Sequence, residues 1–171
     1  MSSLTPQEIL SLRADKLAAP IAESEKESRL SLLEFNLGQE KYAIDAAFVH
    51  SVVPTTYITP LPSVPPYILG ILSVQGLIWS IMDLRIFFNI PRMGISDHPR
   101  AILVEAGGLR FGIMASSSLK IIHPESLSPP PEVTERIPRN VVRGTTKDLT
   151  VVLDIEVLAK DPRMTIQEDS E

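Results

Sequence analysis

The chain offers few residues that could catalyse a reaction or bind a metal ion. Its three histidines, His50, His98 and His123, lie far apart in the sequence, and no cysteine is present to complete a ligand set. Metal sites usually draw two ligands from one short motif, such as H-E-x-x-H. The serines of 116–118 have no neighbouring base that would activate a hydroxyl group. The sequence therefore predicts no metal site, no cofactor and no catalytic residue among these groups.

Two aspartates remain as candidates for acid–base chemistry. Asp83 and Asp154 each follow an apolar run and directly precede an amphipathic turn. A carboxylate at that position accepts hydrogen bonds from the free N–H groups of the first helical turn. We therefore expect Asp83 and Asp154, like Asp45, to be helix caps. The alternative is a small-molecule-binding β-barrel, or a hydrolase that uses the carboxylates of Asp83 and Asp154.

The bulk composition argues against several classes of function. Apolar residues make up 44% of the 171 residues, which is enough to fill a core. The net charge of −5 opposes binding to a phosphate backbone, so nucleic acid is not an expected partner. The longest apolar stretch, 67–84, is broken by glycines and polar residues, so we expect no insertion into a membrane. The lack of cysteine is compatible with a reducing cytoplasm.

Proline and polar segments divide the chain. Ten of the 15 prolines gather at 54–66 and 124–138, which predicts extended loops there. Thr5, Pro6 and Glu8 have the types and spacing of a helix start, so residues 1–29 are predicted to hold one helix, over 5–18, and a charged linker. Residues 161–171 are predicted to form a flexible tail.

Alternating hydrophobicity predicts a mainly β domain over 30–160. In the clearest hairpin, two apolar runs are joined by the pair Gln75-Gly76, a turn signal. Further strands are predicted around 33–37, 42–44, 101–104, 109–114, 119–122, 141–142 and 149–153. Asp45 is expected to cap a short helix in which Phe48, Val49, Val52 and Val53 share one side.

One pattern occurs twice. LIWSIMDLRIFF (77–88) and LTVVLDIEVLAK (149–160) both read as an apolar strand, an aspartate cap and an amphipathic helix. A strand and a glycine-containing turn precede each copy. The repeat predicts two similar small β-barrels with short helices. The rigid, proline-rich loops favour an interaction module over a catalyst, because preordered segments bind partners at low entropic cost.

The order of these landmarks resembles the CheW-like family of chemotaxis coupling proteins. LLEFNLGQEKYAIDAAFVHSVV (32–53) resembles the opening of such domains, and PLPSVPPYILGILSVQGLIWSIMDL (60–84) resembles their most recognisable stretch. Gly112, the prolines at 129–131, Arg143-Gly144 and LDIEVL (153–158) match the later landmarks. The resemblance covers residues 31 to 160.

The resemblance implies a fold and a set of partners. The fold would be two intertwined, five-stranded SH3-like barrels. The function would be a non-catalytic, cytoplasmic adaptor, without cofactor, that links the cytoplasmic tip of a methyl-accepting chemoreceptor to the regulatory domain of a CheA-type histidine kinase. The receptor would bind in a groove between the barrels. By position, that groove would include the following residues: Val49, Ser51, Val52, Gly70, Gln75 and Gly76.

Gln75 stands where the family usually has arginine, and Ser116 stands where it usually has aspartate. The resemblance therefore leaves open a flagellar or a surface-motility pathway. A purely structural domain that binds the kinase without coupling it to receptors is a further interpretation. The kinase-binding residues are not identified by these patterns.

Overall fold

The computed structural model describes residues 30–90, 98–116, 118–130 and 137–164. Its elements in chain order are β1 (Leu32–Leu37), β2 (Glu40–Asp45), η1 (Ala46–Phe48), β3 (Val49–Pro54), β4 (Ile68–Val74), β5 (Leu77–Met82), α3 (Leu84–Phe87), β6 (Arg100–Ala106), β7 (Leu109–Ala115), β8 (Lys120–Ile122), η2 (Arg139–Val141), β9 (Val142–Thr145), β10 (Val151–Leu153), α4 (Ile155–Ala159) and η3 (Pro162–Met164). The mainly β class with short helices is confirmed. The helix and linker predicted within 1–29 lie outside the described residues.

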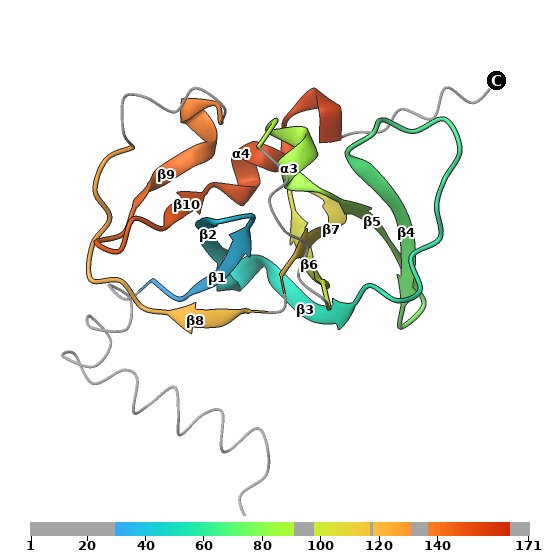
Figure 1. The fold of residues 1–171 in the computed structure, drawn as a ribbon, viewed down its shortest axis with the longest axis horizontal. Helices are drawn as coiled ribbons and strands as arrows, with labels where there is room; N and C mark the ends of the chain where they lie inside the picture. The colour runs from blue at the N-terminus through green and yellow to red at the C-terminus, as the bar shows by residue number, and fades with distance from the viewer. Residues whose placement is uncertain (1–29, 91–97, 117, 131–136, 165–171) are drawn as a thin grey trace, which may run out of the picture.

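The strands form two five-stranded sheets that lie side by side (Figure 1). The first sheet has the order β8-β1-β2-β10-β9, and the second has the order β3-β6-β7-β5-β4. The chain enters the first sheet, builds the whole of the second, and then returns to complete the first. This exchange explains why the predicted subdomains are intertwined in sequence.

The two sheets repeat the same plan. Each contains one parallel pair, β5 with β7 or β10 with β2. In these pairs, β5 and β10 each lead into an aspartate and a short helix. Each also has an isolated bridge from the preceding loop, Thr59 with Ile71 or Ser128 with Thr145. The sequence repeat predicted from 77–88 and 149–160 therefore corresponds to a repeated structural unit, in which a strand leads through an aspartate cap into a short helix.

A glycine lies directly before each bridge. A Cβ atom on Gly70 would lie 2.2 Å from the carbonyl oxygen of Thr59, and one on Gly144 would lie 2.5 Å from that of Ser128. Real Cβ atoms do not approach a backbone oxygen so closely. The loop can pack on the strand at both places only because a side chain is missing.

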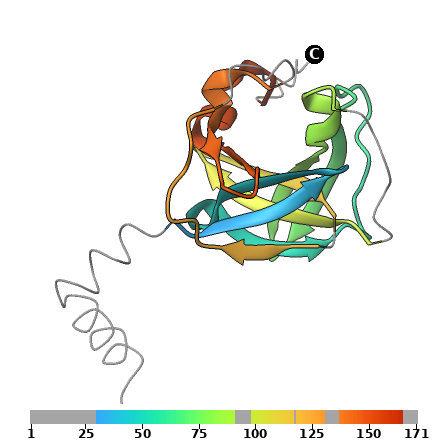
Figure 2. The same cartoon turned by 60° about the vertical axis from the view of Figure 1, so that its left-hand side comes forward.

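The largest hydrophobic cluster lies between the sheets. Residues from both sheets contribute to it, including Phe35 and Tyr42 from the first and Ile102 and Phe111 from the second. The helices α3 and α4 pack against the same cluster through Leu84, Phe87, Ile155 and Leu158. A smaller cluster around Trp79 belongs to the second sheet alone. The shared core fixes how the two halves meet, and it places both helices at the same end of the molecule (Figure 2).

Two expectations need correction. Asp45 caps only the short η1, and residues 49–54 form strand β3 rather than a continued helix. The register of β3 shifts between Val49 and Ser51, which is a β-bulge. Because of the bulge, Val49 and Val52 both face the shared core although they are three residues apart, which is helical spacing. The ordered chain also continues past residue 160, since η3 extends to Met164.

Candidate functional site

The three predicted site residues of β3 are partly covered. Val49 and Val52 pack against the core between the sheets. The hydroxyl oxygen of Ser51 is buried and has no hydrogen-bond partner within the described residues. His50 is exposed, and its ring centroid lies 5.1 Å from that of buried Trp79. Replacing Val49 with aspartate would therefore place a charge against the core and reduce stability, so this change is a poor probe of binding.

The other three predicted residues belong to the β4–β5 hairpin. Gln75 and Gly76 are exposed, with φ angles of 50° and 79°. Two positive φ angles in a two-residue loop are typical of a type I′ turn, so the predicted hairpin is confirmed. Gly70, in contrast, is buried and packed against Thr59. Packing explains the glycine at position 70 without any contact to a partner.

The sheet order separates these six residues. β3 and β4 are the first and last strands of the second sheet. Backbone pairing therefore does not join Val49, Ser51 and Val52 to Gly70, Gln75 and Gly76. The ring contact between His50 and Trp79 does bring β3 close to β5.

A groove lies at the junction of the two sheets, where the resemblance implied one, but its lining residues are ones that sequence reasoning missed. Two hollows share Phe48, and we call them together the Phe48 groove. One hollow, of about 700 Å³, is lined by Phe48, Ile78 and the β6–β7 turn at 105–110. The other, of about 270 Å³, is lined by Phe48 and six residues of the first sheet and α4: Asp45, Arg143, Leu153, Asp154, Ile155 and Glu156. The groove thus draws residues from both halves of the molecule.

The Phe48 groove combines an apolar floor with a mainly acidic rim. Ile78 is 62% exposed although it lies on a strand, and it supplies an apolar wall. Its exposure has a sequence signal, because Trp79 and Ile81 point inward and strand alternation turns Ile78 outward. The rim holds four carboxylates and two arginines: Asp45, Glu105, Asp154, Glu156, Arg110 and Arg143. This lining suits a protein segment with apolar residues flanked by lysine or arginine.

Two ion pairs hold the rim in place. Arg143 lies 3.6 Å from Asp45, which ties β9 to the end of β2. Arg110 lies 3.2 Å from Glu105 across the β6–β7 turn. Both pairs are partly exposed, so each adds little to global stability. Their main effect is to set the charge pattern that a partner would meet.

The three aspartates predicted as caps are confirmed as caps. Asp45 accepts a hydrogen bond from the backbone N–H of Ala47 at 2.9 Å. Asp154 accepts one from Val157 at 3.1 Å. Asp83 accepts one from Arg85 at 2.9 Å.

Asp83 also forms an ion pair with Arg85. Its two carboxylate oxygens also accept hydrogen bonds from the Arg85 guanidinium, at 3.1 and 2.9 Å, and both side chains are buried. The bond to Asp83 raises the pKa of Arg85. Both oxygens of Asp83 are thus engaged in the cap and the ion pair, which weighs against a hydrolase that uses Asp83 as its base.

The described residues show no group of three or more His, Cys, Asp or Glu side chains that could hold a metal ion. Among the same residues, no helix is long and apolar enough to cross a membrane. The described geometry of this region is that of a groove built between two β units.

Comparison with known proteins gives a consistent picture. The family model described as the CheW-like domain matches residues 31–163. The chain is 26% identical over 107 residues to "Chemotaxis protein CheW" of Bacillus subtilis, which covers 61% of this chain and 69% of the relative. It is 24% identical to the protein of the same name from Helicobacter pylori, over 87% of this chain and 93% of that relative.

A solved structure supports the same assignment. The crystal structure of the scaffolding protein TtCheW from Thermoanaerobacter tengcongensis superposes with a TM-score of 0.67 and 31% sequence identity. The match covers 79% of this chain and 90% of that one. The similarity therefore includes both sheets rather than one of them.

Proposed function

Because the chain belongs to the CheW-like domain family, a family of chemotaxis scaffolds, we propose that it couples chemoreceptors to a CheA-type histidine kinase. It would act as a non-catalytic adaptor in the cytoplasm, attached to membrane receptor arrays through its partners. The observation that carries the proposal is the Phe48 groove, which needs residues of both sheets to form. The receptor tip is the proposed occupant of this groove.

The lining of the groove supports an elongated protein occupant. Phe48 and Ile78 provide apolar contact area, and the rim provides paired and unpaired carboxylates. An α-helix with an apolar stripe and flanking basic residues would meet both features. The six residues first assigned to the receptor site stay part of the proposal where they are accessible, above all Gln75 and Gly76.

The proposal is tested by binding and by coupling. The purified full chain should bind a chemoreceptor tip fragment and the regulatory domain of a CheA-type kinase, each at tens of micromolar or tighter, by calorimetry. Adding the chain to membranes that hold both partners should change kinase autophosphorylation. Binding to neither partner would refute the adaptor function. Binding to the kinase without any change in its receptor-dependent activity would support the purely structural interpretation instead.

Replacing Ile78 with glutamate should weaken binding of the receptor tip. The side chain is largely exposed, so its loss costs little stability, but a charge would replace the apolar wall of an acidic groove. We expect a loss of about 1–2 kcal/mol in binding, roughly five- to thirtyfold in Kd. Tyr57 is 82% exposed and does not line the groove, so Tyr57→Glu is the matched control and should bind normally. Equal losses in both variants would contradict this placement of the site.

Replacing Gln75 with arginine should alter receptor affinity or preference while the melting temperature stays almost unchanged. Gln75 is exposed at the tip of the β4–β5 hairpin, so the longer side chain meets no packing barrier. A charged hydrogen bond contributes about 1.5–3 kcal/mol, against about 0.5–1.5 kcal/mol for a neutral one. Titration of both proteins against receptor tips with and without a facing carboxylate measures the effect. Identical curves for both would remove Gln75 from the proposed site.

A further inference from the structure

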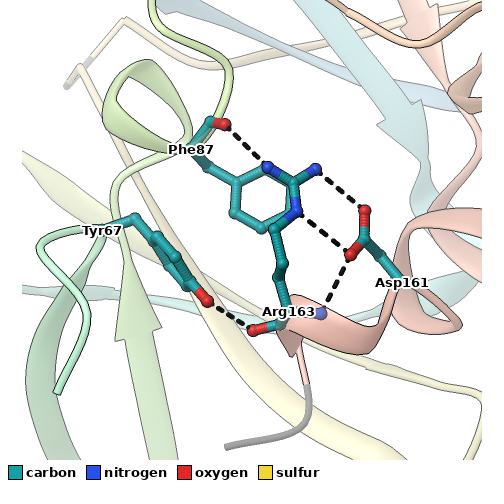
Figure 3. Close-up of polar contacts among 4 residues, drawn as sticks. All are labelled: Tyr67, Phe87, Asp161 and Arg163. Atoms are coloured by element: carbon teal, nitrogen blue, oxygen red, sulfur yellow. Dashed lines mark hydrogen bonds and ion pairs between the residues drawn. The ribbon is translucent and has the colours of Figure 1, made fainter.

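The segment after α4 folds back onto the other half of the molecule. Asp161 follows α4, which continues the first sheet, and Arg163 lies in η3. Tyr67 precedes β4 and Phe87 ends α3, so both belong to the second sheet and its helix. Figure 3 shows Asp161 and Phe87 at the guanidinium group of Arg163, and the Tyr67 hydroxyl group at the backbone carbonyl oxygen of Arg163. We call Tyr67, Phe87, Asp161 and Arg163 the Arg163 latch.

Arg163 makes contacts of three kinds. Its guanidinium donates to both carboxylate oxygens of Asp161, at 3.1 and 2.9 Å. It also lies 3.9 Å above the ring centroid of Phe87, and it donates to the Phe87 carbonyl oxygen at 3.4 Å. A planar, forked cation is needed for this combination, because it must pair with a carboxylate while it stacks on a ring. Arg163 thereby connects η3 to the end of α3.

Tyr67 closes the arrangement. Its hydroxyl group donates to the carbonyl oxygen of Arg163 at 2.7 Å, and its ring meets Phe87 edge to face at a centroid distance of 5.0 Å. Burial raises the pKa of the Tyr67 hydroxyl, so this donor stays protonated at neutral pH. The hydrogen bond to Arg163 lowers the pKa of Asp161, so the carboxylate stays charged. At neutral pH the Tyr67 hydroxyl group is therefore protonated and the Asp161 carboxylate is ionised, as the hydrogen bonds of the latch require.

The latch and the Phe48 groove lie at opposite ends of one short helix. Asp154, Ile155 and Glu156, at the start of α4, line the groove. Asp161 follows the end of α4, and its backbone N–H donates to the carbonyl oxygen of Leu158 at 3.1 Å. A helix of five residues is only about 7.5 Å long and moves as a unit.

The helix also touches the second wall of the groove. A Cβ atom on Gly107, in the β6–β7 turn, would lie 3.3 Å from the Cβ of Ala159. That turn lines the larger hollow. A shift of α4 would therefore change both hollows, one through Asp154 and Glu156 and the other through the turn.

We propose that the Arg163 latch is a positioning device that holds α4 against the second sheet and so sets the shape of the Phe48 groove. Arg163 joins the latch through polar and cation–π contacts rather than through core packing, and 47% of its side chain is accessible, whereas Phe87 belongs to the shared core. The latch can therefore open without loss of the core that joins the sheets. The part of this inference that concerns binding rests on the proposed function.

The first test measures the latch without any partner. Arg163→Ala is compared with Lys160→Ala, which removes a positive charge three residues away, at an exposed position outside the latch. Hydrogen–deuterium exchange should become faster in the amides of α3 and α4 in Arg163→Ala, while the β1–β2 hairpin exchanges as before. Lys160→Ala should match the parent protein. If the amides of α3 and α4 in Arg163→Ala exchange at the same rate as in the parent protein, the proposal is overturned.

The second test measures the consequence for binding. Receptor-tip affinity should fall about two- to thirtyfold in Arg163→Ala, the range known for residues that link two sites, and should be normal in Lys160→Ala. Arg163→Lys keeps the charge but not the fork, so it should restore only part of the affinity. If the parent protein fails to bind the receptor tip, the proposed function is refuted. The hydrogen–deuterium exchange result then still decides whether the latch positions α4. Faster exchange with parental affinity would show that the latch does not shape the groove.

Discussion

Replacing Gly70 with alanine is expected to cost about 3–5 kcal/mol of folding free energy, close to the most that one substitution in a small domain removes. The added Cβ would lie 2.2 Å from the Thr59 carbonyl oxygen and 2.9 Å from the Ile58 side chain, and the φ angle of +151° already disfavours any residue but glycine. The bridge between Thr59 and Ile71 would have to open. Urea denaturation followed by the fluorescence of the single tryptophan, buried Trp79, measures the loss.

Gly76 supplies the matched control. Its φ angle is +79°, but a Cβ there would meet nothing within 4 Å. Gly76→Ala should therefore cost only the backbone term, about 1–2 kcal/mol. Equal costs at Gly70 and Gly76 would show that the loop at Thr59 moves aside easily. The packing explanation of Gly70 would then lose its support, and its assignment to a partner site would regain weight.

Replacing Asp83 with alanine should cost about 3–5 kcal/mol because it leaves the Arg85 guanidinium buried without its counter-ion. The substitution also removes the cap of α3. Asp154→Ala removes an equivalent cap, but the residue at the position of Arg85 there is Glu156, which is exposed. That change should cost about 1 kcal/mol. Thermal or chemical unfolding of the two variants gives the comparison.

A second substitution separates the charge from the cap. In the Asp83→Ala background, Arg85→Met removes the uncompensated charge and should recover most of the stability, leaving the cost of the lost cap. A double variant no more stable than Asp83→Ala would mean that the cap, not the ion pair, is the larger effect. Equal costs for Asp83→Ala and Asp154→Ala would lead to the same conclusion.

These contrasts follow from a repeat that has diverged. The two sheets share their pattern of strand pairing, with one parallel pair each, and they share the bridging loop and the capped helix. They differ in the second residue after the cap, where the second sheet buries Arg85 and the first exposes Glu156 to the groove. In the second sheet this position therefore carries Arg85, which forms a buried ion pair, and in the first sheet it carries Glu156, which is exposed on the rim of the proposed binding site.

Much of the fold could be predicted from sequence because its signals are local. Strand alternation indicated the hairpins, the pair Gln75-Gly76 indicated a two-residue turn, and the aspartates marked the helix starts. These features depend on backbone sterics and hydrogen bonds between residues close in the chain. The order of the same landmarks also identified the family.

The tertiary structure decided what depends on residues far apart in the chain. The bulge in β3 gives Val49 and Val52 the spacing of a helix, so only pairing with β6 distinguishes the strand. The Phe48 groove exists because β1 and β2 pair with strands from the far end of the sequence, and Arg163 meets Phe87 across 76 residues. The free energy of such contacts comes from packing the two halves on one shared core, and no local pattern encodes that packing.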